Sequence, residues 1–171
     1  IQSWESYMRS FRSGPPELCR RLVATDAAVY VTLAYDGPVV ALDALTGETV
    51  RTYDAAAPAR EILYDDGMLY VLCGPEAPEK KRLVVLDARS GEVRWQLDPC
   101  PALPTTPAVR NGRLFYQDAQ AVVCLDSASG AQLWRSPRLA PEKRPGWSAP
   151  TLVACDEVVL CADRRDPPKD N

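Results

Sequence analysis

The sequence predicts an all-β fold, on three observations. A phrase of buried β-formers that ends in Asp, with Gly four residues later, occurs three times in 171 residues. A second phrase, in which a turn residue precedes a short apolar run, alternates with the first. Sixteen prolines are spread through the chain, and apart from a short opening segment (Ile1, Trp4, Tyr7, Met8 and Phe11) no stretch keeps a helical spacing of apolar residues. A repeat of this kind constrains the architecture more than any single motif does.

The first phrase predicts a strand, a tight turn and a second strand. Its copies are VVALDALTGETV at 39–50, LVVLDARSGEVRW at 83–95 and AVVCLDSASGAQLW at 121–134. The aspartates are Asp43, Asp87 and Asp126, and the glycines are Gly47, Gly91 and Gly130. We expect each Asp to accept hydrogen bonds from backbone N–H groups of its turn, and each Gly to supply a positive φ. Trp95 and Trp134 follow their aspartates by eight residues, where the first copy has Arg51.

The second phrase predicts a hairpin in front of each first phrase. Its copies run over 26–33, 66–73, 111–118 and 155–163, and we align them on Tyr30, Tyr70, Phe115 and Val159. Asp-Gly and Asn-Gly turns join these runs to apolar runs before them. Each unit then holds four strands in roughly 40–45 residues, which is the blade of a β-propeller. The chain is expected to be a partial β-propeller of four-stranded antiparallel blades, with about three and a half blades present.

The blade boundaries follow from the repeat. We expect blades at about 18–54, 59–97 and 106–136, and an incomplete blade at 149–171. Residues 1–17 are interpreted as the end of a preceding element or a linker, and both termini as cut from a longer chain. A sandwich or barrel does not repeat a turn signature at this period, and solenoids have shorter or helical units.

Composition excludes several kinds of function. The chain has no histidine, so these residues hold no Ser-His-Asp triad, Cys-His pair or imidazole metal site. The net charge of −3 favours neither nucleic acid nor an anionic membrane as a partner. No apolar run approaches the roughly 20 residues of a membrane-spanning helix. We therefore predict no catalytic residue, no metal site, no nucleic-acid partner and no membrane span.

The six cysteines show no CxxC spacing, and most are interpreted as small apolar residues. Cys155 and Cys161 flank a predicted hairpin and could face each other across it. Such a placement would allow a disulfide, whereas the favoured interpretation keeps both as thiols.

Written as Leu-Asp-x-x-[Thr/Ser]-Gly-x-x-x-Trp, the first phrase resembles the pyrroloquinoline-quinone-like (PQQ-like) propeller repeat. The matching residues are Leu42-Asp43-x-x-Thr46-Gly47, Leu86-Asp87-x-x-Ser90-Gly91-x-x-x-Trp95 and Leu125-Asp126-x-x-Ser129-Gly130-x-x-x-Trp134. The resemblance covers roughly 17–163, and the Gly-His and Trp-Asp pairs of WD40 blades are absent. It implies that Trp95 and Trp134 pack between neighbouring blades, and that the three aspartates form turns and are not catalytic acids.

The resemblance implies one of two functions. Many proteins with this repeat, including the lipoprotein of the outer-membrane protein assembly machine, are non-catalytic scaffolds or binding modules. The alternative is a fragment of a PQQ-dependent quinoprotein dehydrogenase. Such enzymes hold the quinone near the propeller axis with calcium or a lanthanide, and often have a vicinal Cys-Cys pair, which this sequence lacks. A PQQ cofactor is therefore implied only by the resemblance, and no residue of this sequence is assigned to bind it.

We favour the scaffold, whose expected partner is another protein or the remainder of its own propeller. A periplasmic or cell-envelope location is likewise implied only by the resemblance.

Long loops gather on one predicted face. In a four-stranded meander, the loops between the second and third strands share a face with the connections between blades, and nearly all the loop length lies there. Binding tends to be carried by long loops on a rigid scaffold. Two of these loops bring Lys80, Lys81, Arg82, Lys143, Arg144 and Trp147. They are interpreted either as a basic and aromatic patch for a protein or anionic group, or as solvated loops with Trp147 tucked under a blade.

Overall fold

The computed structural model describes residues 19–75, 80–140 and 150–163, and strands dominate them. Fourteen strands form three four-stranded antiparallel sheets and one two-stranded hairpin. The first sheet holds β1 (Leu22–Ala24), β2 (Ala28–Thr32), β3 (Val39–Asp43) and β4 (Thr49–Tyr53), and a 3₁₀ turn, η1 (Asp54–Ala56), follows it. The second holds β5 (Ala59–Asp65), β6 (Met68–Cys73), β7 (Arg82–Asp87) and β8 (Val93–Leu97). The third holds β9 (Ala108–Arg110), β10 (Arg113–Gln117), β11 (Ala121–Asp126) and β12 (Gln132–Pro137), and the hairpin is β13 (Thr151–Cys155) with β14 (Val158–Ala162).

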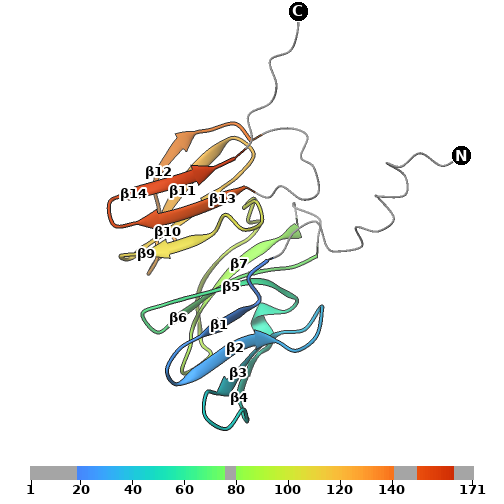
Figure 1. Ribbon diagram of the computed structural model, residues 1–171. Coiled ribbons are helices and arrows are strands. Elements are labelled where there is room, and N and C mark those ends of the chain that lie inside the picture. The colour runs from blue at the N-terminus through green and yellow to red at the C-terminus, as the bar shows by residue number, and fades with distance from the viewer. Residues whose placement is uncertain (1–18, 76–79, 141–149, 164–171) are drawn as a thin grey trace, which may run out of the picture.

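The sheets are stacked as blades around a common axis (Figure 1). In each complete sheet the strands pair in chain order, from the first to the fourth. The first strands of neighbouring sheets lie against one another, β1 with β5, β5 with β9 and β9 with β13. These strands therefore form the inner edge, and β4, β8 and β12 form the outer edge. The predicted partial β-propeller is confirmed.

Alternation along the middle strands builds a core on both sides of a blade. In β7, Val84 and Leu86 pack in the cluster shared with the first blade. Leu83 and Val85, between them in sequence, pack in the cluster shared with the third blade. All four are at most 2% exposed. A blade with neighbours on both faces therefore needs an uninterrupted apolar run, which explains why each copy of the repeated phrase has four apolar residues before its Asp.

Strand pairing corrects one detail of the predicted alignment. Leu63 pairs with Tyr70, and Ala108 pairs with Phe115. The corresponding pair in the last hairpin is Val153 with Leu160, because Ala154 pairs with Val159. Leu160 and not Val159 occupies the aromatic position. The prediction was off by one residue because the last turn is Asp-Glu, without the glycine that marks the Asp-Gly and Asn-Gly turns.

Pairing in the same hairpin also settles the placement of Cys155 and Cys161, for which opposition across the hairpin was left open. Cys155 pairs with Val158 beside the turn, whereas Cys161 pairs with Leu152 near the far end. The two thiols do not face each other, because the tight turn after Cys155 sets a register in which Cys161 lies several residue pairs away. The favoured interpretation of both as thiols agrees with this register.

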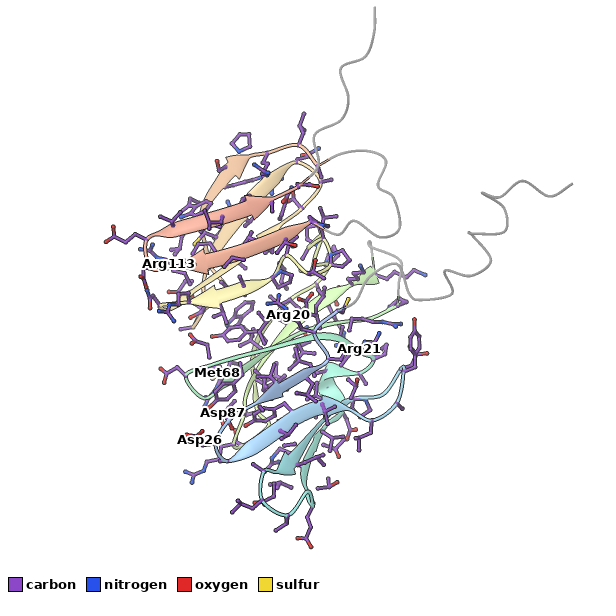
Figure 2. The ribbon with its side chains drawn as sticks, viewed as in Figure 1. Arg20, Arg21, Asp26, Met68, Asp87 and Arg113 are labelled. Atoms are coloured by element: carbon purple, nitrogen blue, oxygen red, sulfur yellow. The ribbon has the colours of Figure 1, made fainter. Side chains whose placement is uncertain are left out.

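Each blade has two ends with different connections. The turn between the first and second strands bonds to the turn between the third and fourth, through Ala44 N–H to Ala27 O (3.1 Å), Ala88 N–H to Gly67 O (2.9 Å) and Ser127 N–H to Gly112 O (3.0 Å). We call this end the turn face, and the opposite end, which carries the longer connections, the loop face. Figure 2 shows Met68, Asp87 and Arg113 near the turn face, and Arg20 and Arg21 toward the other end. In the described part of the chain no helix is long and apolar enough to cross a membrane.

Candidate functional site

The repeated turn is held by the side chain of its aspartate. Asp43 Oδ1 accepts from the N–H groups of Leu45 (3.0 Å) and Thr46 (2.8 Å). Asp87 Oδ1 accepts in the same way from Arg89 (3.0 Å) and Ser90 (2.8 Å). The pKa of Asp87 lies below its usual range because of the backbone N–H of Ser90 and the Arg94 guanidinium. These carboxylates are occupied by their own turns, which is a structural role.

The turns also hold the next blade in place. Trp95, from the outer strand of the second blade, donates its Nε1–H to the carbonyl of Ser127 in the third blade (3.0 Å). Tyr53, from the outer strand of the first blade, makes the equivalent contact with the second blade: its hydroxyl donates to the carbonyl of Ala88. Ser127 and Ala88 both directly follow the turn aspartate. An outer-strand aromatic thus reaches the same carbonyl of the following blade at both junctions.

The repeat glycines differ in what lies beside them. Gly47 and Gly130 have the same positive φ of 74°. A Cβ on Gly130 would lie 2.7 Å from the Trp95 ring, whereas nothing described lies within 4 Å of a Cβ on Gly47. The glycine of the second and third copies therefore permits close approach of the preceding blade as well as the turn conformation.

This pair of glycines gives a matched test of the blade junction. Gly47→Ala should cost about 1–2 kcal/mol of unfolding free energy, for placing an L-residue at positive φ. Gly130→Ala should cost roughly 1–3 kcal/mol more, because the new methyl group collides with the indole. Urea unfolding of the two variants measures the difference, and equal losses would show that the contact with Trp95 contributes nothing.

Trp134 is less covered than Trp95. It packs against Phe115, with ring centroids 5.9 Å apart, and remains 39% exposed. The next sheet has only its inner two strands, β13 and β14, so no described turn covers the indole. The structure therefore places Trp95 at a blade junction and leaves Trp134 at an open surface.

A polar cluster ties the blades together at the inner edge of the loop face. Glu61 in β5 has no exposed surface, and its Oε1 accepts from Arg20 Nε (2.9 Å) and Nη2 (2.6 Å). Its Oε2 accepts from the N–H of Thr105 (3.0 Å). Arg20 Nη2 also donates to the carbonyl of Pro107, and the Thr105 hydroxyl donates to the carbonyl of Pro150 (2.5 Å). We call Arg20, Glu61 and Thr105 the axial cluster.

The axial cluster joins the segments that enter four successive blades, from Arg20 before β1 to Pro150 before β13. Burial raises the pKa of Glu61, and the Arg20 guanidinium opposes that shift. Lys81, which is 6% exposed, opposes it more weakly from the side of the second blade. The cluster was not predicted from the sequence. The signal that could have pointed to it is Glu61 directly before the apolar run Ile62-Leu63 of β5, since a charge buried in a strand needs partners.

The predicted basic loops are only partly described. Lys80 is exposed and Lys81 is buried, with the Lys81 carbonyl accepting from Cys100 N–H (2.7 Å). Arg82 is half-buried and donates to the carbonyl of Ala57 (3.0 Å). The other three predicted residues, Lys143, Arg144 and Trp147, lie outside the described residues. Among Lys80, Lys81 and Arg82, Lys80 therefore presents its side chain most openly on the loop face.

The inner strands line a shallow hollow next to the axial cluster. Its volume is about 320 Å³, and its lining comes from Arg20, from β1 and β5 (Val23, 62–64) and from β9 and β13 (108–109, 152–154). The lining is largely apolar, with the Arg20 guanidinium at the loop face. A ligand in this hollow would contact apolar side chains and the Arg20 guanidinium, and no other described charged side chain lines the hollow.

The described residues offer no carboxylate cluster for the quinone site that the resemblance implies. In quinoproteins, such a site uses several carboxylate or amide ligands around a cation. Within 19–75, 80–140 and 150–163, no three His, Cys, Asp or Glu side chains gather closely enough to hold a metal ion. Glu61, a buried carboxylate of the inner strand β5, already has both oxygens bonded, one to Arg20 and the other to the N–H of Thr105. We therefore derive no chemistry through a quinone.

Together, the stacked four-stranded sheets and the Asp-to-Gly turns define a segment of a PQQ-like repeat propeller. A sequence profile described as the outer membrane protein assembly factor BamB matches residues 2–98 and, in a second alignment, residues 35–165. The chain therefore belongs to the BamB family of PQQ-like propellers, and the predicted resemblance is confirmed. Comparison with curated protein sequences gives no match.

Solved structures share the fold at low sequence identity. The computationally designed Ika4 protein is 18% identical, with a TM-score of 0.64 over 89% of each chain. BamB from Moraxella catarrhalis is 19% identical, with a TM-score of 0.60 over 82% of this chain and 42% of BamB. Quinohemoprotein alcohol dehydrogenase ADHIIG from Pseudomonas putida HK5 is 22% identical, with a TM-score of 0.54 over 74% of this chain and 22% of the enzyme. The chain thus spans less than half of either natural protein, and these similarities establish the fold alone.

Proposed function

We propose that this chain is a non-catalytic, protein-binding part of a β-propeller, and that its loop face contacts the partner. The observation that carries the proposal is the axial cluster. Its hydrogen bonds join the entries to four blades, so the connections that end at Thr105 and at Pro150 end on a rigid base. Long loops on a rigid scaffold are the usual site of binding.

The chemistry of the axial cluster supports binding over catalysis. Glu61 is buried, and its two oxygens accept three hydrogen bonds from within the protein. A general acid or base must exchange a proton with a bound substrate. Both oxygens of the Glu61 carboxyl group are already hydrogen-bonded within the protein. The family description, outer membrane protein assembly factor, favours a protein partner from that process.

Site-specific photo-crosslinking in the source cell tests this function. A photoreactive residue is placed at Lys80 on the loop face or at Leu45 on the turn face, which is 95% exposed. We expect the Lys80 probe to form a discrete adduct with one protein, and the Leu45 probe to form none. Both probes sit on exposed side chains, so both variants should fold alike.

Two results would contradict the proposal. Discrete adducts from Leu45 alone would move the binding surface to the turn face. Alcohol-dependent dye reduction by the purified native protein, after addition of PQQ and Ca²⁺, would favour the alternative function as part of a quinoprotein dehydrogenase. That assay is run on wild type and on Glu61→Gln, since a quinone site near the axis would be sensitive to the charge of this carboxyl group.

A further inference from the structure

The loop face carries a second group of charged side chains where the first and second blades meet. Tyr35 lies in the connection between β2 and β3 and is 57% exposed. The Cζ atoms of Arg21 and Arg60 lie 4.8 Å and 5.3 Å from the centroid of its ring. A guanidinium within about 6 Å of an aromatic ring makes a cation–π contact. We call Arg21, Tyr35 and Arg60 the arginine cluster, and Figure 2 shows Arg21 at the same end of the first blade as Arg20.

Hydrogen bonds hold both guanidiniums of the arginine cluster in place. Arg21 Nη1 donates to the carbonyl of Tyr35 (2.9 Å), which ties the segment before β1 to the connection between β2 and β3. Arg60, at the start of β5, donates from Nε to the carbonyl of Gly74 (2.8 Å). Its Nη2 forms an ion pair with Asp36 Oδ1 (2.9 Å), and the Arg60 side chain is only 11% exposed. Both guanidiniums are therefore positioned before a ligand arrives, which lowers the entropic cost of binding.

The arginine cluster has more positive charge than its described partners neutralise. Asp36 pairs with Arg60, and no described carboxylate pairs with Arg21. Among the described residues, none accepts a hydrogen bond from Arg60 Nη1, which is buried. A buried donor without an acceptor is costly, and more so when it is charged. Because both guanidiniums contact the same ring, an anion bound to Arg21 would also stabilise the charge of Arg60.

The exposed Lys80 lies beside the arginine cluster. A Cβ on Gly74, whose carbonyl accepts from Arg60, would lie 2.6 Å from the carbonyl oxygen of Lys80. The backbone of Lys80 is therefore a neighbour of the residue that holds Arg60. A photoreactive residue at position 80 consequently reports on a ligand of the arginine cluster.

Carboxylates fit this arrangement better than the phosphates of a membrane or a nucleic acid. A guanidinium can form two parallel hydrogen bonds with one carboxylate. Anionic membranes and nucleic acids are bound through wide basic surfaces. The arginine cluster instead holds two guanidiniums, one of them paired with Asp36, in a chain of net charge −3. Its size and charge suit one or two acidic side chains.

We propose that the arginine cluster binds an acidic segment of the partner protein, with an Asp or Glu carboxylate on the Arg21 guanidinium. Arg60 adds positive charge, and the Tyr35 ring holds the two like charges near each other at the surface. This inference rests on the proposed function, because it names the chemistry of the partner at the loop face. Both blades that form the arginine cluster are described, so the site does not depend on any further blade.

Fluorescence anisotropy of a labelled hexaglutamate peptide tests this chemistry on the native protein. We expect saturable binding that weakens as salt is added, and no binding of labelled hexaglutamine. Arg21→Met should weaken the binding at least about fivefold, because it removes a charge-assisted hydrogen bond. Arg113→Met is the matched control, since it removes the same charge from an exposed position near the turn face and should change binding by less than about twofold.

Photo-crosslinking from position 80 separates this inference from the proposed function. Loss of the adduct in Arg21→Met, with the adduct retained in Arg113→Met, supports both. An adduct that persists in Arg21→Met leaves the protein partner in place and overturns the acidic ligand. If wild type gives no adduct, the proposed function fails, and the anisotropy measurement alone decides whether the arginine cluster binds carboxylates.

Failure of hexaglutamate to bind at millimolar concentration, or equal weakening in Arg21→Met and Arg113→Met, would overturn the proposal. So would co-sedimentation with phosphatidylglycerol vesicles that depends on Arg21 in the absence of hexaglutamate binding, since the ligand would then be a lipid headgroup.

Discussion

Trp95→Ala is expected to lower the free energy of unfolding by about 3 kcal/mol, the low end of the range for an aromatic removed from a packed site. The indole is half-buried against Gly130 of the next blade, and its Nε1–H bonds to Ser127 O. Removing it leaves a cavity at the blade junction and an unpaired carbonyl. Urea unfolding followed by far-ultraviolet circular dichroism measures the loss.

Trp134→Ala is the matched control, because it removes the same side chain from the same repeat position. Trp134 is 39% exposed and keeps the contact with Phe115, so the expected loss is about 1 kcal/mol. Equal losses for the two variants would contradict the conclusion that, of these two tryptophans, only Trp95 stabilises a blade junction.

Arg20→Met is expected to destabilise the chain by roughly 1–3 kcal/mol at pH 7, because it leaves the buried carboxylate of Glu61 without its main partner. The Arg20 side chain is 45% exposed, so water compensates part of the loss. Urea unfolding measures it. Arg21→Met is the control, since the Arg21 guanidinium donates to the exposed carbonyl of Tyr35 and should change stability by less than about 0.5 kcal/mol.

The destabilisation caused by Arg20→Met should depend on pH, because Arg20 compensates the charge of Glu61. Burial raises the pKa of Glu61 above 4.5, so the folded chain holds this proton more tightly than the unfolded chain. The favourable contribution of Glu61 is then complete below about pH 4.5 and is lost as the pH rises through the folded pKa. In Arg20→Met the opposing charge is gone, the pKa rises further, and the loss extends to higher pH.

The destabilisation by Arg20→Met should therefore be small at pH 4 and grow toward pH 7. Urea unfolding at pH 4, 5.5 and 7 measures this dependence. The double variant Arg20→Met, Glu61→Gln should not show it. A destabilisation that is the same at all three pH values would mean that Arg20 acts through packing and not through the charge of Glu61.

The blades could be predicted because their signals lie close together in the sequence. An Asp that bonds to N–H groups two or three residues later, and a Gly at φ near 74°, specify a hairpin turn within five residues. Alternating contacts on both faces of β7 require a continuous apolar run. The turn Asp156-Glu157 lacks the glycine of the other turns, and there the predicted alignment of the strand after the turn was wrong by one residue.

The axial cluster and the coverage of the two tryptophans could not be predicted, because each depends on residues distant in sequence. Arg20 meets Glu61 across 41 positions and Pro107 across 87. Trp95 and Trp134 occupy the same repeat position, yet only Trp95 has a described turn across from it. Sequence by itself determined the repeat, the strands and their turns, because local hydrogen bonding and side-chain alternation decide them. Only the tertiary structure decided which charges meet at the axis and which aromatic is covered, because desolvation and contact depend on what the neighbouring blade provides.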